Sequence, residues 1–415
     1  MTTSLTAGTR RKLHYAWVIV ATGALGLFSC FGLGRYAYSM LLPGMQAGLG
    51  LTYDLMGYIG TGNFVGYLLS VLAAPRLMRR LRPRGTAAAG LLLIGLCMIG
   101  IGLCSGFLPI LILYALAGVG SGFTNIPLMA LVTYWFRSEQ RGRAAGLVIA
   151  GNGLGIILAG FLIPALNRSF GADGWRHGWI VLGAICLAVA ACAAAFLRNH
   201  PSEMGLEPVG RMAEASPEQF IHREHRGDAS VLFRLGILYL LFGATFMVYG
   251  TFIVTTMVKE YGISEARAGL YWSWVGFFSF FSGIGFGALS DRIGRRRGLY
   301  VVFAIQTAAY LLAGLKVGTA GMVLSLILYG SAVFAIPAIM AAAVGEYLGL
   351  SRASTSFATI TIFFGIGQVI GPAGAGLIAN VTGAFTAPYL ICGILTAVAA
   401  VLALLLPDPP EGRLS

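Results

Sequence analysis

The chain has 415 residues, of which 57% are hydrophobic and only 10% are charged. Soluble proteins carry about 25% charged residues, so this composition excludes an ordinary soluble domain and predicts a membrane protein. The formal net charge of +13 would favour nucleic acid binding in a soluble protein. Here the basic residues cluster between apolar segments as orientation signals, and we therefore expect no nucleic acid partner.

Twelve apolar segments follow one another along the chain, each long enough to cross a bilayer core about 30 Å thick. They lie at 14–42, 55–75, 85–105, 107–136, 142–166, 176–198, 233–258, 267–290, 298–316, 320–347, 353–379 and 384–406. The first is too long for a signal-peptide core, and no small-residue cleavage site follows it. We expect an all-α polytopic protein with 12 transmembrane helices.

Lys and Arg are unevenly distributed between the two sets of connecting segments. If the N-terminus is cytoplasmic, the cytoplasmic segments hold 22 of them and the outer segments hold 5. Cytoplasmic loops of membrane proteins carry this excess. The imbalance predicts that both termini are cytoplasmic, in a chain that crosses the cell inner (plasma) membrane many times.

The polar stretch 199–232 contains three prolines and mixed charges, and it is typical of a linker. It separates a six-helix half at 1–198 from another at 233–415. The halves resemble each other: "FTNIPLMA" (123–130) matches "FAIPAIMA" (334–341), "GNGLG" (151–155) matches "FGIGQ" (364–368), and "PRLMRR" (75–80) matches "DRIGRR" (291–296). Repeated halves are typical of transporters, which bind substrate near the bilayer midplane between the repeats.

Polar side chains within the apolar segments are candidates for a substrate site, because they are costly to expose to lipid. The candidates are Arg35, Tyr38, Asn63, Asn125, Tyr249 and Gln368. When the first and seventh segments are aligned by their apolar patterns, Tyr249 occupies the position that corresponds to Arg35. Asn125 and Gln368 each precede a proline, so a structural role at the backbone freed by that proline is an equal alternative for both.

Arg35 stands out because no other Lys or Arg lies well inside an apolar segment. Its face of the helix is aromatic and polar, which suits a cavity wall where a guanidinium binds a carboxylate through two hydrogen bonds. Two alternatives remain. The side chain could extend to the outer lipid headgroups, or it could hydrogen-bond to backbone at the end of a neighbouring helix.

The segment "GALSDRIGRRRG" (287–298) resembles the conserved loop motif of the major facilitator superfamily. In the first-half copy, "APRLMRRLRPRG" (74–85), Pro75 stands where the aspartate would fall. The segments "GRYAYSMLLPGMQ", "GNFVGYLL" and "GIGQVIGPAGAGLIANVTGAF" are similar to the YbfB/YjiJ branch of that superfamily. The resemblance covers essentially the whole chain and implies the two-half major facilitator fold.

The resemblance also implies a gate formed by the loop motif, with Asp291, Arg292, Arg295 and Arg296 as its residues. Asp291 would contact the start of the fifth helix, near 142–143, in one state of the transport cycle and release it in the other. With no acid in the first-half copy, gating would be asymmetric between the halves.

These patterns predict a secondary active or facilitative transporter of a small molecule, with an organic anion or carboxylate as the substrate and alternating access as the mechanism. An efflux pump for amphipathic drug-like compounds is one alternative, and a non-transporting membrane sensor is another. The sensor is disfavoured because no extramembrane segment exceeds the linker, and an enzyme because no nucleophile or acid–base cluster appears.

We expect no cofactor and no metal, and we expect the chain to act as a monomer in the lipid bilayer. No carboxylate or histidine lies deep in an apolar segment, where proton-coupled carriers commonly place one. Facilitated diffusion, exchange with a counter-anion, and symport with a coupling proton carried by the bound anion all stay open.

Overall fold

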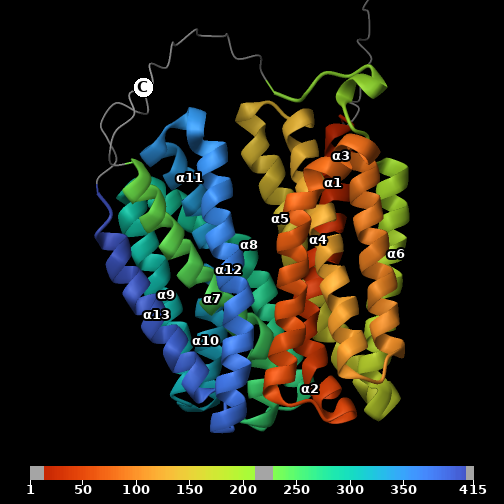
Figure 1. Cartoon of the computed structure of the whole chain (residues 1–415), viewed down its shortest axis with the longest axis vertical. Helices are drawn as coiled ribbons and strands as arrows, with labels where there is room; N and C mark the ends of the chain where they lie inside the picture. The colour runs from red at the N-terminus through yellow and green to blue at the C-terminus, as the bar shows by residue number, and fades with distance from the viewer. Residues whose placement is uncertain (1–13, 211–227, 408–415) are drawn as a thin grey trace, which may run out of the picture.

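The computed structural model describes residues 14–210 and 228–407, and nearly all of them are helical (Figure 1). In this part of the chain, the strand-type pairing is limited to one isolated bridge between Phe136 and Val209. The first group of helices comprises α1 (Ala16–Leu27), the π-helix η1 (Phe28–Tyr36), α2 (Ala37–Leu49), α3 (Tyr53–Leu103), α4 (Phe107–Trp135), α5 (Ser138–Phe170), the 3-10 turn η2 (Gly171–Asp173) and α6 (Gly174–Phe196).

After the 3-10 turn η3 (Pro201–Met204), the second group comprises α7 (Asp228–Lys259), α8 (Glu265–Ile293), α9 (Arg295–Gly314), α10 (Gly318–Ala332), α11 (Ala335–Leu348), α12 (Leu350–Thr382) and α13 (Thr386–Leu404). The two groups stand side by side, with α1–α6 on one side of the molecule and α7–α13 on the other (Figure 1).

Ten helical stretches among the described residues are long and apolar enough to cross a membrane. Two of these stretches are longer than a single membrane crossing requires. The stretch Tyr53–Leu103 has 51 residues, or about 77 Å at 1.5 Å per residue, and it breaks at Arg82, whose φ is 58°. Pro83 explains the break, because proline disfavours helical backbone at the preceding residue. The all-helical, multi-pass fold is confirmed, and the count of twelve crossings stays a prediction.

The predicted helix at 320–347 is divided into α10 and α11. The break at Phe334 leaves its N–H outside the helical ladder, and the Ser282 Oγ of α8 accepts a hydrogen bond from it at 3.0 Å. Pro337 falls in the first turn of α11, where its missing N–H costs little. The "FAIPAIMA" segment is therefore a kink rather than a continuous helix.

The same glycine packing recurs in both groups. A side chain added to Gly155 of α5 would collide with the backbone of η1, where the Phe28 carbonyl oxygen lies 2.7 Å from the added carbon. In the second group, Gly367 and Gly371 of α12 face the carbonyl oxygens of Leu240 and Ala244 on α7. Small residues let helices approach closely in membranes, so both groups contain the same type of helix contact. Its register differs from the predicted sequence match, because Gly155 corresponds to Gly371 in this contact and not to Gln368.

Among the described residues, the contacts between the two groups run from the middle of the bundle toward one of its ends. We call the end that holds residues 14 and 407 the terminal end and the opposite one the far end. In the half of the bundle toward the far end, a side-chain carbon on Gly153 of α5 would lie 2.7 Å from the Gly276 carbonyl oxygen of α8. Toward the terminal end, Gly146 of α5 and Gly285 of α8 have open space within 4 Å.

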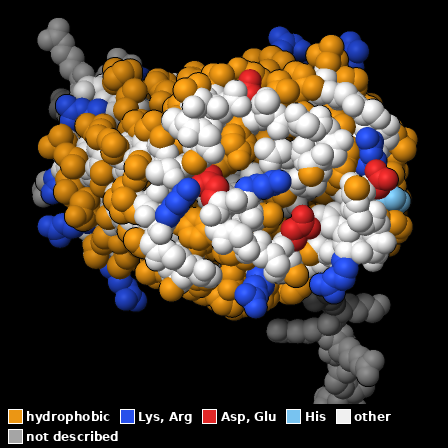
Figure 2. All heavy atoms as spheres, turned by 90° about the horizontal axis from the view of Figure 1, so that it is seen from below, with side chains coloured by type: hydrophobic (Ala, Val, Ile, Leu, Met, Phe, Trp, Pro, Cys, Tyr) orange, Lys and Arg blue, Asp and Glu red, His pale blue; other side chains and the backbone are white. Residues whose placement is uncertain are grey.

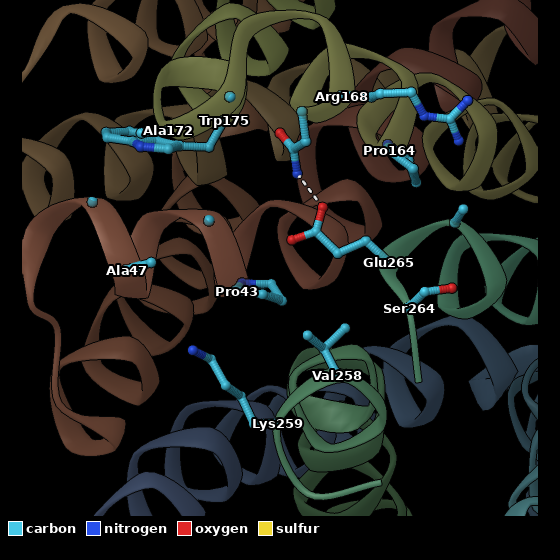
Figure 3. A pocket seen from close by; sticks show the side chains of 15 residues that line it. Pro43, Ala47, Pro164, Arg168, Ala172, Trp175, Val258, Lys259, Ser264 and Glu265 are labelled. Carbon is cyan, nitrogen blue, oxygen red and sulfur yellow. Dashed lines mark hydrogen bonds between the residues drawn. The ribbon is translucent and has the colours of Figure 1, made fainter. Parts of the chain in front are cut away.

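Three hydrogen bonds among the described residues join the groups. The Ser273 hydroxyl of α8 donates to the Ile157 carbonyl of α5 at 3.2 Å. The Thr61 hydroxyl of α3 donates to the Val369 carbonyl of α12 at 3.0 Å. At the far end, the Asn167 amide of α5 donates to the Glu265 carboxylate of α8 at 2.9 Å, in the wall of a cavity of about 530 Å³ (Figure 3). Figure 2 looks at the far end, where charged side chains of both signs lie within a mostly uncharged face bordered by hydrophobic residues.

Candidate functional site

Arg35 lies on η1, a π-helical segment between α1 and α2. The sequence there, "FSCFGLGRY", contains Gly32 and Gly34, which are weak helix formers. Segments with the wider π-helical turn occur frequently at functional sites. The segment directs Arg35 toward the interior, where the residue is 9% exposed.

Three aromatic rings surround the Arg35 guanidinium. Its central carbon lies 4.6 Å from the ring centre of Phe31, 4.9 Å from that of Phe64 and 4.8 Å from that of Tyr67. Guanidinium groups are attracted to aromatic faces within about 6 Å, more strongly where water is excluded. Phe64 is buried, whereas Phe31 and Tyr67 are partly exposed, so this aromatic cage has an accessible side.

A short hydrogen-bond network fixes the orientation of Arg35. Its Nε donates to the Asn63 Oδ1 at 3.3 Å, and the Asn63 amide donates to the Tyr114 carbonyl at 3.0 Å. The Tyr114 hydroxyl donates in turn to the Arg35 carbonyl at 3.3 Å. These hydrogen bonds connect three helices of the first group, η1, α3 and α4, around the guanidinium.

The Arg35 Nη2 is buried and has no hydrogen-bond acceptor among the described residues. Within 14–210 and 228–407, the ion pairs include none to Arg35. A buried charge without a partner is costly. The position within the protein, enclosed by rings, is incompatible with the alternative in which Arg35 extends to the outer lipid headgroups.

Two further predicted residues join the Arg35 cluster. The Tyr38 hydroxyl donates to the Met56 carbonyl at 2.8 Å, and the Tyr38 ring lies 4.9 Å from the ring centre of Tyr114. The Asn125 amide donates to the Tyr67 hydroxyl at 3.2 Å, behind one wall of the cage. Arg35, Asn63, Tyr38 and Asn125 therefore lie in one connected set of contacts.

Sequence reasoning missed Phe64, Tyr67 and Tyr114 as site residues. The signal for two of them was present, because Tyr67 lies four residues after Asn63 and three after Phe64, and these spacings place side chains on one side of a helix. Nothing in the sequence indicated Tyr114, because its contribution depends on how α4 packs against η1.

Tyr249 and Gln368 lie in the second group, apart from this cluster in the described contacts. Tyr249 is fully buried, its hydroxyl is 2.7 Å from the Ser325 hydroxyl, and its ring stacks on Tyr329 with centres 4.2 Å apart. The two tyrosines belong to a packed aromatic core. Gln368 is buried on α12, next to the Val369 carbonyl that joins the groups.

The predicted gating residues lie where α8 and α9 meet at the terminal end. Asp291 is 60% exposed and pairs with Arg295 at 2.5 Å. Arg295 also contacts Glu346 of α11, with its Nε donating at 2.7 Å. Arg296 donates to the Leu406 carbonyl at 3.4 Å, and Arg292 is exposed. Around Gly142, at the start of α5, space is open within 4 Å.

Comparison with known families identifies the chain. Residues 27–405 match the family described as "Uncharacterised MFS-type transporter YbfB". The chain belongs to this family of major facilitator transporters. The predicted family is confirmed, and the chain is a membrane transporter rather than an enzyme.

Relatives of this YbfB-type transporter include carriers of acidic metabolites by name. The "Hexuronate transporter" of Bacillus subtilis (strain 168) is 23% identical over 92% of this chain and 92% of its own length. "Monocarboxylate transporter 2" of Homo sapiens is 23% identical over 93% of this chain and 84% of its own. Together with the family, these relatives indicate a secondary transporter of small molecules.

Solved structures share the fold. A D-xylose–proton symporter superimposes with a TM-score of 0.74 at 16% identity, covering 96% of this chain and 99% of that one. A bacterial homologue of the human lysosomal transporter Spinster, in an inward-facing and unoccupied conformation, gives 0.73 at 14% identity, covering 96% of this chain and 98% of that one. These likenesses establish the major facilitator fold.

Proposed function

We propose that this transporter carries a small organic anion and that Arg35 binds its anionic group. The observation that carries the proposal is the unpaired, buried guanidinium, whose Nη2 has no acceptor in the described structure. A carboxylate or phosphate would supply that acceptor and neutralise the charge. The relatives named for hexuronate and monocarboxylate transport support the same class of substrate.

The ligand reaches Arg35 through the accessible side of the aromatic cage. Phe31 and Tyr67 are partly exposed, and rotation of either ring uncovers the guanidinium. Asn125 holds the Tyr67 hydroxyl at 3.2 Å, so it positions this ring. We assign Asn63 and Tyr38 to the support of Arg35, and Gln368 to the opposite wall of the binding region. Tyr249, fully buried against Tyr329 and Ser325, is assigned to the packing of the second group.

We infer that the terminal end faces the cytoplasm, because the segments there carry most of the Lys and Arg. The contacts between the groups toward the far end, and the open space toward the terminal end, then correspond to an inward-open state. Closure of the terminal end would bring Asp291 to the start of α5 near Gly142. In the present state Asp291 pairs with Arg295 instead.

Transport in proteoliposomes tests the role of Arg35. We expect uptake of D-glucuronate or L-lactate, with D-glucose as the uncharged comparison. Arg35→Gln removes charge-assisted hydrogen bonds worth about 1.5–3 kcal/mol, so anion affinity should fall about 10- to 100-fold. Arg35→Lys keeps the charge but loses the two-point geometry, and it should retain part of the affinity.

Arg267→Gln is the matched control, because it removes one positive charge from an exposed residue of α8. It should transport like the parent protein. Normal anion uptake by Arg35→Gln, with the fold intact by circular dichroism, would refute the anion site. Equal uptake of D-glucose and D-glucuronate by the parent would refute the substrate class.

A further inference from the structure

A groove of about 690 Å³ lies on the first group of helices, away from the Arg35 cluster. Its apolar wall is formed by Leu69 and Leu72 of α3 and Phe123 of α4, and its basic rim by Arg76, Arg79 and Arg80. Leu69 is 58% exposed and Leu72 is 62% exposed.

Helical geometry places this groove on the outside of the bundle. Residues advance by about 100° per position on a helix, so Leu69 lies about 200° around α3 from Tyr67, which faces Arg35. Phe123 is likewise two positions before Asn125, which bonds Tyr67. Both helices thus present one side to the cage and the opposite side to the groove, which therefore faces lipid.

The arginines lie at headgroup depth. Arg76 is 23 residues after Tyr53, the start of α3, which corresponds to about 35 Å along the helix. Leu69 lies about 24 Å along it, within a hydrocarbon core about 30 Å thick. The groove therefore runs from the acyl-chain region to the headgroup region at the terminal end.

The three arginines have no acidic partner among the residues that the structure places. Arg76 donates only to the Leu72 carbonyl of its own helix, at 3.4 Å. The ion pair of this segment belongs to Arg82, which lies 3.8 Å from Glu203 and does not line the groove. In the second-half copy of the motif, by contrast, Asp291 pairs with Arg295; in the first half, Pro75 occupies that position.

We propose that the groove is a binding site for one anionic phospholipid. An acyl chain lies along Leu69, Leu72 and Phe123, and the phosphate is bound by Arg76, Arg80 and Arg79. Basic pockets between transmembrane helices bind anionic lipid headgroups in this manner. The loss of the acid at Pro75 is what leaves the basic cluster available, so the site is confined to the first half.

Lipid binding to purified protein tests the site. Native mass spectrometry in detergent should show retention of phosphatidylglycerol over phosphatidylcholine. Arg76→Gln with Arg80→Gln should lower phosphatidylglycerol affinity by roughly fivefold per arginine. The paired control is Arg141→Gln with Arg297→Gln, two exposed residues at the same end that do not line the groove; it should bind like the parent.

The apolar wall is tested separately. Leu72→Trp fills the groove without a change of charge, and it should also lower phosphatidylglycerol retention. An equal loss in the control pair would overturn the site in favour of diffuse charge attraction. Competition by inorganic phosphate at the concentration of the lipid, or full retention by Leu72→Trp, would overturn the assignment to a lipid.

Discussion

At the scale of the residue, Asn63 determines the orientation of the Arg35 guanidinium. It accepts from the Arg35 Nε at 3.3 Å and donates to the Tyr114 carbonyl at 3.0 Å. We predict that Asn63→Asp folds but transports anions poorly, because the new carboxylate pairs with Arg35 and competes with the substrate. Anion affinity should fall at least tenfold, as measured by ligand-induced thermal shift.

Asn63→Leu should behave differently. It leaves the buried Arg35 Nε without a partner, which costs about 1–3 kcal/mol. The melting temperature of the unliganded protein should therefore drop, whereas Asn63→Asp should keep it. Gln306→Glu, an acid placed at a buried position of α9 in the other group, controls for a general effect of a buried carboxylate. Undiminished anion affinity in Asn63→Asp would contradict the prediction.

At the scale of the element, the approach of α5 to α8 determines which end is closed. A Cβ added to Gly153 of α5 would lie 2.7 Å from the Gly276 carbonyl oxygen, whereas a Cβ added to Gly146 of the same helix would have open space around it. Because backbone cannot give way as a flexible side chain can, Gly153→Ala should disfavour the closed far end. Gly146→Ala should not open it.

Spin labels at Ala47 of α2 and Ala266 of α8 report this change, because both exposed residues line the far-end cavity. The labels require replacement of the six native cysteines. Pulsed electron paramagnetic resonance should show a longer distance population in Gly153→Ala only. The same distance distribution in both variants would mean that this contact does not control closure.

At the scale of the whole molecule, Asp291 is predicted to stabilise the state in which the terminal end is closed. Its carboxylate would then face the positive end of the α5 dipole, a contact worth about 0.3–1 kcal/mol. Asp291→Asn also removes the exposed pair with Arg295 from the present state, and such pairs contribute little. The substitution should therefore favour the present state by at most about fivefold, and the long component of the Ala47–Ala266 distance should shrink. Asp173→Asn, an exposed acid at the far end, should leave the distribution unchanged.

The sequence alone could predict most of the fold. Apolar runs of about 20 residues can only be satisfied in a bilayer as helices, since each backbone group then bonds within its own segment. The positions of nearly all spans followed from that rule. The kink at Phe334 was missed because the bond from its N–H to Ser282 depends on the neighbouring helix α8.

The candidate site was predictable only in part. Arg35 and Asn63 were found because polar groups in apolar segments are rare, and the structure joins them at 3.3 Å. The pairing of Tyr249 with Arg35 rested on sequence symmetry. In the structure Tyr249 packs against Tyr329 and Ser325. The glycine contacts common to both groups pair Phe28 with Ala244 rather than with Phe242, a register that the apolar pattern of a single helix does not fix.

The sequence by itself determined that this chain crosses a membrane repeatedly, as a member of a transporter family, with one arginine inside a span. Only the tertiary structure decided that Arg35 is enclosed by three aromatic rings rather than directed to headgroups. The reason is physical. The energetic cost of a charge in an apolar helix can be recognised from that one segment, whereas the groups that offset the cost lie on helices distant in the chain and are brought together by packing.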